Sequence, residues 1–160
     1  MKIGIVSDTH NHLANVARIV QLFNSAGVDR VVHTGDITQA KTLHVLAGLD
    51  APVVGVWGNN DLERESLARA CLELGFQFAD PPLVLDWSGR RITVVHDPLE
   101  LNDELRLNPV VLHGHTHRRV VEQSAGRIVF NPGECAGHMA GHNAIGVIDL
   151  ENLEPEILMF

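Results

Sequence analysis

Short apolar runs alternate with amphipathic stretches through the first half of the chain. The apolar runs have the length of strands and cover residues 2–6, 31–33 and 53–56. The amphipathic stretches carry apolar side chains at helical spacing, end before a glycine, and cover residues 14–26, 38–47 and 62–74. This alternation is typical of βαβ units on a mostly parallel sheet, with a helix between successive strands.

The second half of the chain changes character after Gly75. It holds short β-rich runs joined by turns, at residues 83–85, 92–95, 110–112, 128–130, 144–148 and 156–159. We expect these runs to form a second sheet. Because no repeat, low-complexity tract or linker interrupts the 160 residues, the sequence predicts a single domain over residues 1–160, built as a two-sheet sandwich with outer helices.

Composition narrows the classes of function. The formal charge of −8 and the lack of a basic stripe argue against nucleic-acid binding, which needs clustered Lys and Arg. Two cysteines, Cys71 and Cys135, make a poor disulfide framework and fit a reducing compartment. The residues after Met1 read as strand rather than as a signal peptide, and no apolar run approaches membrane-spanning length. We expect a cytoplasmic protein without nucleic-acid or membrane partners. The sequence leaves open whether the chain forms a homo-oligomer.

Side chains that bind metal ions follow five of the apolar runs. They are Asp8 and His10, Asp36, Asn59, His96, and then His115 and His117. Core packing does not require such residues, whereas open α/β sheets assemble their sites in loops at the carboxyl ends of strands. Carboxylate, amide oxygen and imidazole together suit Mn²⁺, Fe, Zn²⁺ or Co²⁺. The pattern therefore indicates a site for two metal ions.

Most of these motifs also have a structural interpretation when taken alone. Asp8 could cap the following helix, and both Gly35-Asp36 and Gly58-Asn59-Asn60-Asp61 are common turn sequences. The strongest local signal is His113-Gly114-His115-Thr116-His117, because three histidines in five residues are unfavourable in a core. Within it we expect His113 to support a ligand or belong to the strand rather than to bind metal.

The chain resembles the calcineurin-like metallophosphoesterases, and within them the small YfcE-type phosphodiesterase branch, over essentially its whole length. The matching motifs are, in order, Asp8-Thr9-His10, Gly35-Asp36, Gly58-Asn59-Asn60-Asp61, His96, Gly114-His115-Thr116-His117 and Asn131-Pro132-Gly133-Glu134. The resemblance implies an α/β fold, a four-layer αββα sandwich in which helices flank two mixed β-sheets. It also implies a dinuclear metal centre. One ion would be held by Asp8, His10, Asp36 and His117, and the other by Asp36, Asn59, His96 and His115, with Asp36 as the bridge.

The implied activity is metal-dependent hydrolysis of phosphodiester bonds, that of a phosphoric diester hydrolase. Two cations roughly 3.5–4 Å apart neutralise a phosphate and lower the pKa of a bridging water, and the resulting metal-bridging hydroxide attacks in line. Asp8, Asp36, Asn59 and His96 would be catalytic by positioning hydroxide and phosphate through the metals. The expected cofactors are two Mn²⁺ ions, with Ni²⁺, Co²⁺, Fe²⁺ or Zn²⁺ as alternatives. The expected partner is a small-molecule phosphodiester substrate.

Two positions depart from the pattern of the broader family. Asn60 stands where many family phosphatases have a histidine that protonates the leaving oxygen, which favours diesters with good leaving groups. Asp97 stands where a glycine usually follows the ligand histidine, and its carboxylate could bind an ion, orient His96 or repel phosphate. We expect Asp61 to cap a helix or support a ligand.

Two other functions remain open from the sequence. One is a phosphomonoesterase or protein phosphatase, and the other is a metal-binding interaction scaffold like the retromer subunit that shares this fold. Outside the strand ends, we expect surface or loop roles for His12, His44, His138 and His142, although His12 and His138 could line the cleft. Cys135 is expected to be a packed thiol or to support a ligand rather than to act as a nucleophile. Trp57 and Trp87 are expected to be core residues.

Overall fold

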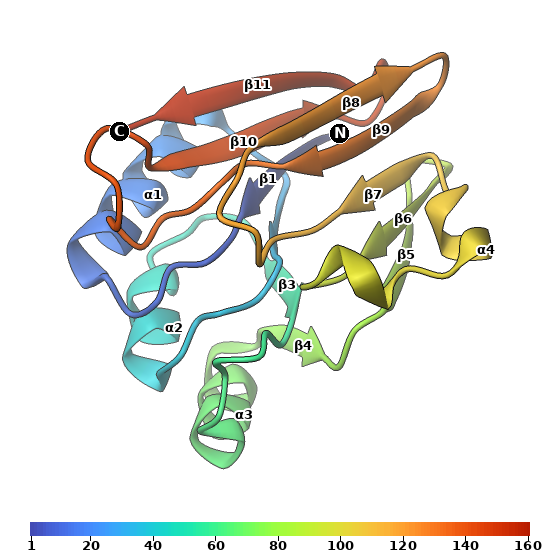
Figure 1. The fold of residues 1–160 in the computed structure, drawn as a ribbon. Helices are drawn as coiled ribbons and strands as arrows, with labels where there is room; N and C mark the ends of the chain where they lie inside the picture. The colour runs from blue at the N-terminus through green and yellow to red at the C-terminus, as the bar shows by residue number, and fades with distance from the viewer.

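Two mixed β-sheets pack face to face in the computed structural model, which describes residues 1–160 (Figure 1). The strands of the first sheet are β1 (Lys2–Val6), β2 (Arg30–His33), β3 (Val53–Val56), β4 (Gln77–Ala79), β10 (Ala144–Asp149) and β11 (Glu154–Met159). Those of the second are β5 (Leu83–Trp87), β6 (Arg90–Val94), β7 (Val110–Leu112), β8 (Val120–Ser124) and β9 (Arg127–Asn131). The strand orders are β11-β10-β1-β2-β3-β4 and β5-β6-β7-β9-β8.

The first sheet is parallel from β1 to β4. The alternation of strands and helices predicted this for β1, β2 and β3, whereas β4 was not predicted. Its other half is antiparallel, because β10 pairs with β1 and β11 pairs with β10. The prediction that residues 144–148 and 156–159 belong to the second sheet was wrong. The chain returns after β9 to the free edge of β1, where Ile148 lies opposite Ile3.

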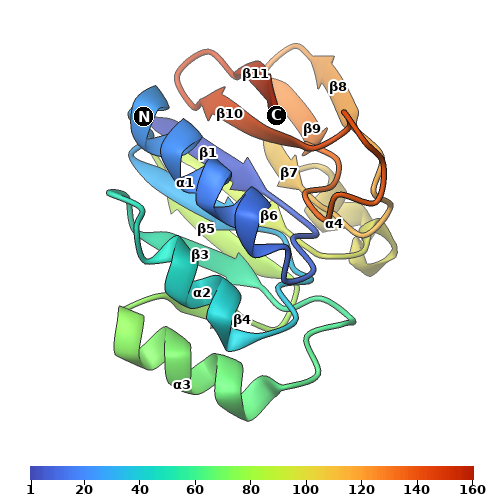
Figure 2. The same ribbon diagram turned by 90° about the vertical axis from the view of Figure 1, so that its left-hand side faces the viewer.

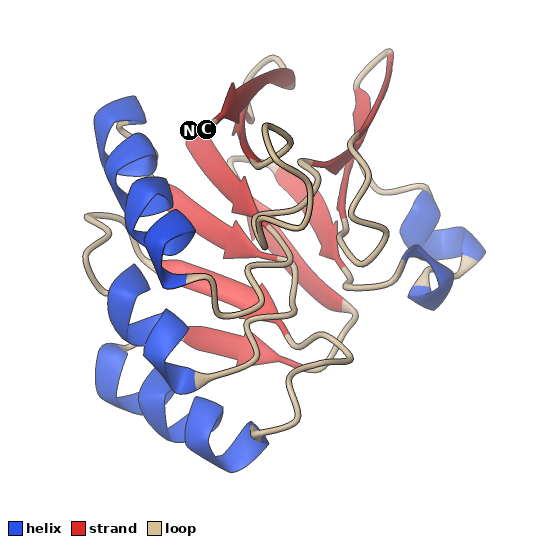
Figure 3. Cartoon of the chain, turned by 60° about the vertical axis from the view of Figure 1, so that its left-hand side comes forward, coloured by secondary structure: helices blue, strands red, loops and turns tan.

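Three helices cover the outer face of the first sheet, namely α1 (Leu13–Ala26), α2 (Ala40–Leu46) and α3 (Arg64–Leu74) (Figures 2 and 3). The second sheet has a thinner outer layer, made by the short helices η1 (Pro98–Glu100) and α4 (Asp103–Arg106). Leu101 and Leu105 from this connection pack against Val95 and Val111. The predicted four-layer αββα sandwich is therefore confirmed. None of the helices is both long and apolar enough to cross a membrane.

Alternation along β1 assigns its side chains to two different cores. Ile3 and Ile5 are fully buried between the sheets, in the same cluster as Leu112 and Phe130 of the second sheet. The opposite face of β1 packs under α1, whose Phe23 lies directly over Gly4. A Cβ atom at Gly4 would approach the Phe23 ring to 2.6 Å, so only glycine lets the helix lie this close. Packing in these two cores holds the sheets and the helices in place around the loop that follows β1.

Candidate metal centre

Loops from both sheets converge at one edge of the sandwich, where the parallel strands have their carboxyl ends. The loops after β1, β2 and β3 come from the first sheet, and those after β6 and β7 come from the second. All seven residues expected as metal ligands lie on these loops. The structure groups them into two clusters with Asp36 between.

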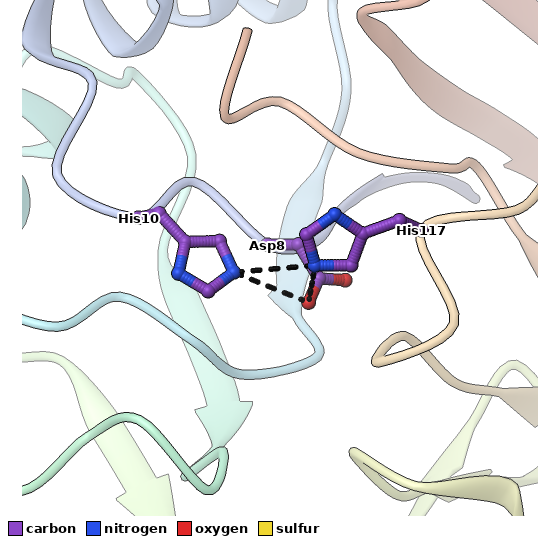
Figure 4. Close-up of side chains that lie close together, drawn as sticks. All are labelled: Asp8, His10 and His117. Carbon is purple, nitrogen blue, oxygen red and sulfur yellow. Dashed lines mark hydrogen bonds and ion pairs between the residues drawn. The ribbon is translucent and has the colours of Figure 1, made fainter. Parts of the chain in front are cut away.

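The first cluster consists of Asp8, His10 and His117 (Figure 4). His117 Nε2 lies 3.3 Å from Asp8 Oδ1, and His10 Nε2 lies 3.8 Å from the same oxygen. The two Nε2 atoms are 3.3 Å apart. Asp8 Oδ1 is buried without a hydrogen-bond donor, so an acceptor oxygen and two imidazole nitrogens face one point.

The second cluster consists of Asn59, His96 and His115. Asn59 Oδ1 lies 2.9 Å from His96 Nε2 and 3.0 Å from His115 Nδ1. The two ring nitrogens are 3.3 Å apart. His96 is oriented from behind, because its Nδ1 lies 2.8 Å from the carbonyl oxygen of Thr34 and must donate its hydrogen there. This fixes Nε2 as the nitrogen that faces the cluster.

Asp36 stands between the two clusters. Its Oδ2 lies 3.3 Å from His10 Nε2 of the first cluster and 3.5 Å from His96 Nε2 of the second. Its side chain is only 2% exposed, so the carboxylate faces the centre rather than solvent. This is the position that the sequence analysis expected for a bridging ligand.

The backbone is strained at five of the seven expected ligands. Positive φ angles occur at Asp8 (51°), His10 (40°), Asp36 (59°), His115 (65°) and His117 (56°). Such left-handed conformations are uncommon for residues with a Cβ atom, and each disfavours the fold by on the order of 1 kcal/mol or more. Strain of this kind clusters at functional sites, where the surrounding structure enforces a required side-chain direction.

Buried hydrogen bonds hold in place the loops that carry Asp8 and Asp36. Asp61 joins two loops, because its Oδ2 accepts from the backbone N–H of Asp36 (3.0 Å) and of Gly58 (2.7 Å). It therefore supports Asp36, one of the two roles expected for it. On the other side, Thr34 Oγ1 donates to Ser7 Oγ (2.7 Å), which in turn donates to Asp8 Oδ2. This hydroxyl chain could not be predicted from the sequence, because no spacing rule links residues from different strands.

Gly114 allows the loop after β7 to reach the carboxylate of Asp8. A Cβ atom at this position would lie 2.8 Å from Asp8 Oδ2 and 2.9 Å from Thr34 Oγ1, and still closer to Ser7 Oγ. The adjacent backbone N–H of His115 donates to Asp8 Oδ2 at 3.1 Å. The glycine thus brings the two sheets into direct contact at the site.

The carboxylates at the centre are held ionised despite their burial. Burial alone would raise the pKa of Asp8, but the contacts with His10 and His117 and the hydrogen bond from Ser7 outweigh it and keep this pKa well below its ordinary value. Burial likewise opposes ionisation of Asp36, yet contacts with His96 and Asn60 lower its pKa to about 2. Burial would lower the pKa of His96, but Asp36 outweighs it and raises this pKa to about 9. The metal-free centre thus pairs carboxylates with protonated imidazole.

The donor set suits two divalent cations of the borderline type. Each cluster offers imidazole nitrogen together with carboxylate or amide oxygen, and no thiolate takes part. The two cysteines are buried free thiols outside both clusters, and burial raises the pKa of Cys71 to about 11. The partnerless Asp8 Oδ1 and the close approach of nitrogens within each cluster are arrangements that a cation would relieve.

Other residues that the sequence analysis weighed lie around the two clusters. His113 is buried, belongs to neither cluster and has its Nδ1 3.4 Å from Asn131 Nδ2. Asp97 faces His115, with 3.5 Å between Oδ2 and Nε2, and its other oxygen accepts from the N–H of Leu99. Glu134, which the sequence analysis treated only as part of a motif, is buried beside His117 and His138.

The two-sheet αββα sandwich gathers carboxylates, an amide and imidazoles at the carboxyl ends of its strands, and these groups could hold metal ions. The chain belongs to the calcineurin-like phosphoesterase superfamily, whose domain model matches residues 1–153. The prediction of an enzyme that hydrolyses phosphate esters is thereby confirmed at the level of the family.

Relatives with established names cover almost the whole chain. A phosphodiesterase from Methanocaldococcus jannaschii is 35% identical, over 96% of this chain and 96% of its own. The phosphodiesterase YfcE of Escherichia coli is 28% identical, over 93% of this chain and 88% of its own. Among solved structures, that of an archaeal phosphodiesterase superposes with a TM-score of 0.89 at 33% identity, and covers 100% of both chains.

Proposed function

We propose that the chain is a metal-dependent phosphodiesterase that works with a dinuclear centre at Asp8, His10, Asp36, Asn59, His96, His115 and His117. The observation that carries this proposal is the position of Asp36, whose Oδ2 lies within 3.5 Å of an imidazole nitrogen from each cluster. A carboxylate in that position can bind two cations at once, which a mononuclear site does not need. The phosphodiesterases named above support the choice of reaction.

Two divalent cations, when bound, would supply positive charge to the phosphate ester and bring the pKa of coordinated water toward neutrality. The chain itself contributes by holding the metal-binding groups in place in advance. Asp8 and Asp36 are held ionised and immobile by hydrogen bonds, and the Thr34 carbonyl fixes the ring of His96. The donors therefore face the centre before substrate arrives, and little reorganisation is needed when charge builds up on the phosphate oxygens.

A groove beside the second cluster has room for a small substrate. It has a volume of about 260 Å³, and its lining includes Asn59, His96 and His115 together with Trp57, Arg64, Pro81, Asp97 and Glu100. The space suits one arm of a compact phosphodiester rather than a polymer. The larger cavity of about 570 Å³ lies by Lys2, Asp149 and Glu154, at the opposite ends of the strands, and we assign it no role in the reaction.

Asn60 bears on which esters can be cleaved. Its backbone N–H donates to Asp36 Oδ1 (2.9 Å) and its side-chain amide donates to Asp36 Oδ2 (2.8 Å). An amide has no pKa suited to protonating a leaving alkoxide. We therefore propose that diesters with good leaving groups react faster than alkyl esters, with Mn²⁺ as the first ion to test among those that this donor set admits.

Hydrolysis of bis-p-nitrophenyl phosphate and p-nitrophenyl phosphate by chelated protein, reloaded separately with Mn²⁺, Ni²⁺, Zn²⁺ or Mg²⁺, tests the proposal. We expect metal-dependent turnover that is faster for the diester. Asp36→Asn should abolish turnover and reduce the number of bound ions, whereas the remote Asp149→Asn should change neither. No turnover with any metal by a chain that binds two ions would contradict the enzymatic function and favour an interaction scaffold.

A further inference from the structure

His115 and His117 each have a carboxylate at the ring nitrogen that faces away from the clusters. His117 directs Nε2 at Asp8 and places Nδ1 3.4 Å from Glu134 Oε2. His115 directs Nδ1 at Asn59 and places Nε2 3.5 Å from Asp97 Oδ2. The two histidines therefore face their clusters with opposite nitrogens, and each has an acid from another loop behind it.

The two acids differ in their exposure to water. The side chain of Glu134 is 1% exposed and that of Asp97 is 27% exposed. Glu134 Oε2 also has no hydrogen-bond donor of good geometry, although it is buried. A hydrogen bond from an imidazole to a carboxylate is stronger in a buried environment, because water screens the same pair near the surface.

Each acid has a second, structural task that uses its other oxygen. Glu134 Oε1 accepts from the N–H of Met139 at 3.0 Å, and Asp97 Oδ1 accepts from the N–H of Leu99 at 2.9 Å to begin η1. These tasks leave Oε2 and Oδ2 pointing at the imidazoles. An amide in place of the acid keeps an oxygen for the backbone N–H and loses the charge toward the ring, so the two tasks can be separated experimentally.

We propose that Glu134 and Asp97 are positioning residues for His117 and His115, and that their unequal burial makes the first cluster the tight ion site and the second the exchangeable one. The proposal rests on the dinuclear centre argued above. A histidine whose far ring nitrogen lies against a carboxylate is held in ring orientation and is a better electron donor to a metal. The exposed acid would provide less of this support, so the ion at the second cluster would dissociate first.

The test is calorimetric titration of the chelated full-length chain with Mn²⁺, without substrate. For the unchanged chain we expect two binding steps of different affinity. Glu134→Gln should weaken the tighter step by about 10-fold or more and leave the weaker one, whereas Asp97→Asn should weaken the weaker step by a smaller factor and leave the tighter one. Asp103→Asn is the matched control, because it removes the same charge from the same connection and Asp103 is exposed at the start of α4.

Several outcomes would overturn this inference. Two unchanged binding steps in both variants would refute the positioning roles while leaving the proposed function intact. An equal loss in Asp103→Asn would mean that net charge, not contact with an imidazole, sets the affinity. A third ion that disappears in Glu134→Gln would make Glu134 a ligand, together with His117 and His138, rather than a positioning residue. Failure of the unchanged chain to bind two ions would refute the dinuclear centre itself.

Discussion

The metal-free protein should become less stable as the pH rises above neutrality, because of the pair formed by His96 and Asp36. Burial alone would lower the pKa of His96, but the hydrogen bond and charge of Asp36 raise it to about 9. In the unfolded chain this imidazole has its ordinary pKa of 6.5. The folded state therefore binds the proton more tightly than the unfolded state does, which stabilises it wherever that proton is present.

The size of the effect follows from this difference. A rise from 6.5 to about 9 corresponds to roughly 3 kcal/mol of unfolding free energy. Both side chains are 2% exposed, so solvent screening does not reduce it much. The stabilisation is complete below pH 6.5 and is lost as the pH rises through 9. The raised pKa of His117, caused first by its contact with Asp8, acts in the same direction.

His33 should make the metal-free protein less stable at acidic pH. Full burial lowers its pKa to about 4, so the folded state holds this imidazole neutral. Its contribution is present above pH 6.5 and is lost as the pH falls through 4, since the unfolded state then binds the extra proton. The metal-free protein should therefore be most stable near pH 6.5.

Urea unfolding of chelated protein, monitored by circular dichroism between about pH 5 and about pH 9.5, measures this profile. Asp36→Asn is the informative variant, because removing the principal partner of His96 should flatten the alkaline slope whatever the stability of the variant at neutral pH. A stability that rises between pH 6.5 and 9, or an alkaline slope as steep in Asp36→Asn as in the unchanged chain, would refute the reasoning.

Three further predictions concern the ions and the packing around them. Mn²⁺ at about 100 times its dissociation constant should stabilise the chain by about 2.7 kcal/mol per site, measured as a rise in the thermal midpoint that chelator reverses; no rise would argue against a built metal centre. Gly114→Ala should destabilise the chain by about 1–3 kcal/mol and lower its affinity for Mn²⁺ in calorimetry, because the new Cβ would collide with the Asp8 carboxylate; unchanged affinity would contradict this. Phe23→Ala should lower the unfolding free energy by about 3–5 kcal/mol in urea but leave the number of bound ions unchanged, because Phe23 packs on Gly4 in the outer core.

The first half of the fold could be predicted because its local patterns and its tertiary contacts agree. Helices of period 3.6 alternate with buried strands, and that order specifies a parallel sheet. The end of the chain could not be assigned in the same way. A short apolar run predicts a strand at residues 144–148 but says nothing about its partner, and the free edge of β1 decided it. The strand β8 was missed because residues 121–124 are exposed and largely polar, with no apolar alternation.

The ligand types could be predicted because each follows an apolar run, but their supporting contacts could not. Asp97 was expected to bind an ion, repel phosphate or orient His96, and the structure places it against His115 instead. The connection after β6 and the loop after β7 meet there through the packing of the second sheet, which sequence spacing does not specify. Glu134 reaches His117 in the same way, from the loop after β9.

Both clusters take donors from both sheets, which links the metal centre to the packing between the sheets. Asp8 and His10 follow β1, whereas His117 follows β7, and Asn59 of the first sheet faces His96 of the second. The donors meet only when the apolar core between the sheets has formed. That core must also stabilise a centre with strained backbone, a partnerless carboxylate oxygen and closely spaced nitrogens. Bound cations would relieve the last two features. Folding would thus build a centre whose full stability depends on its ions.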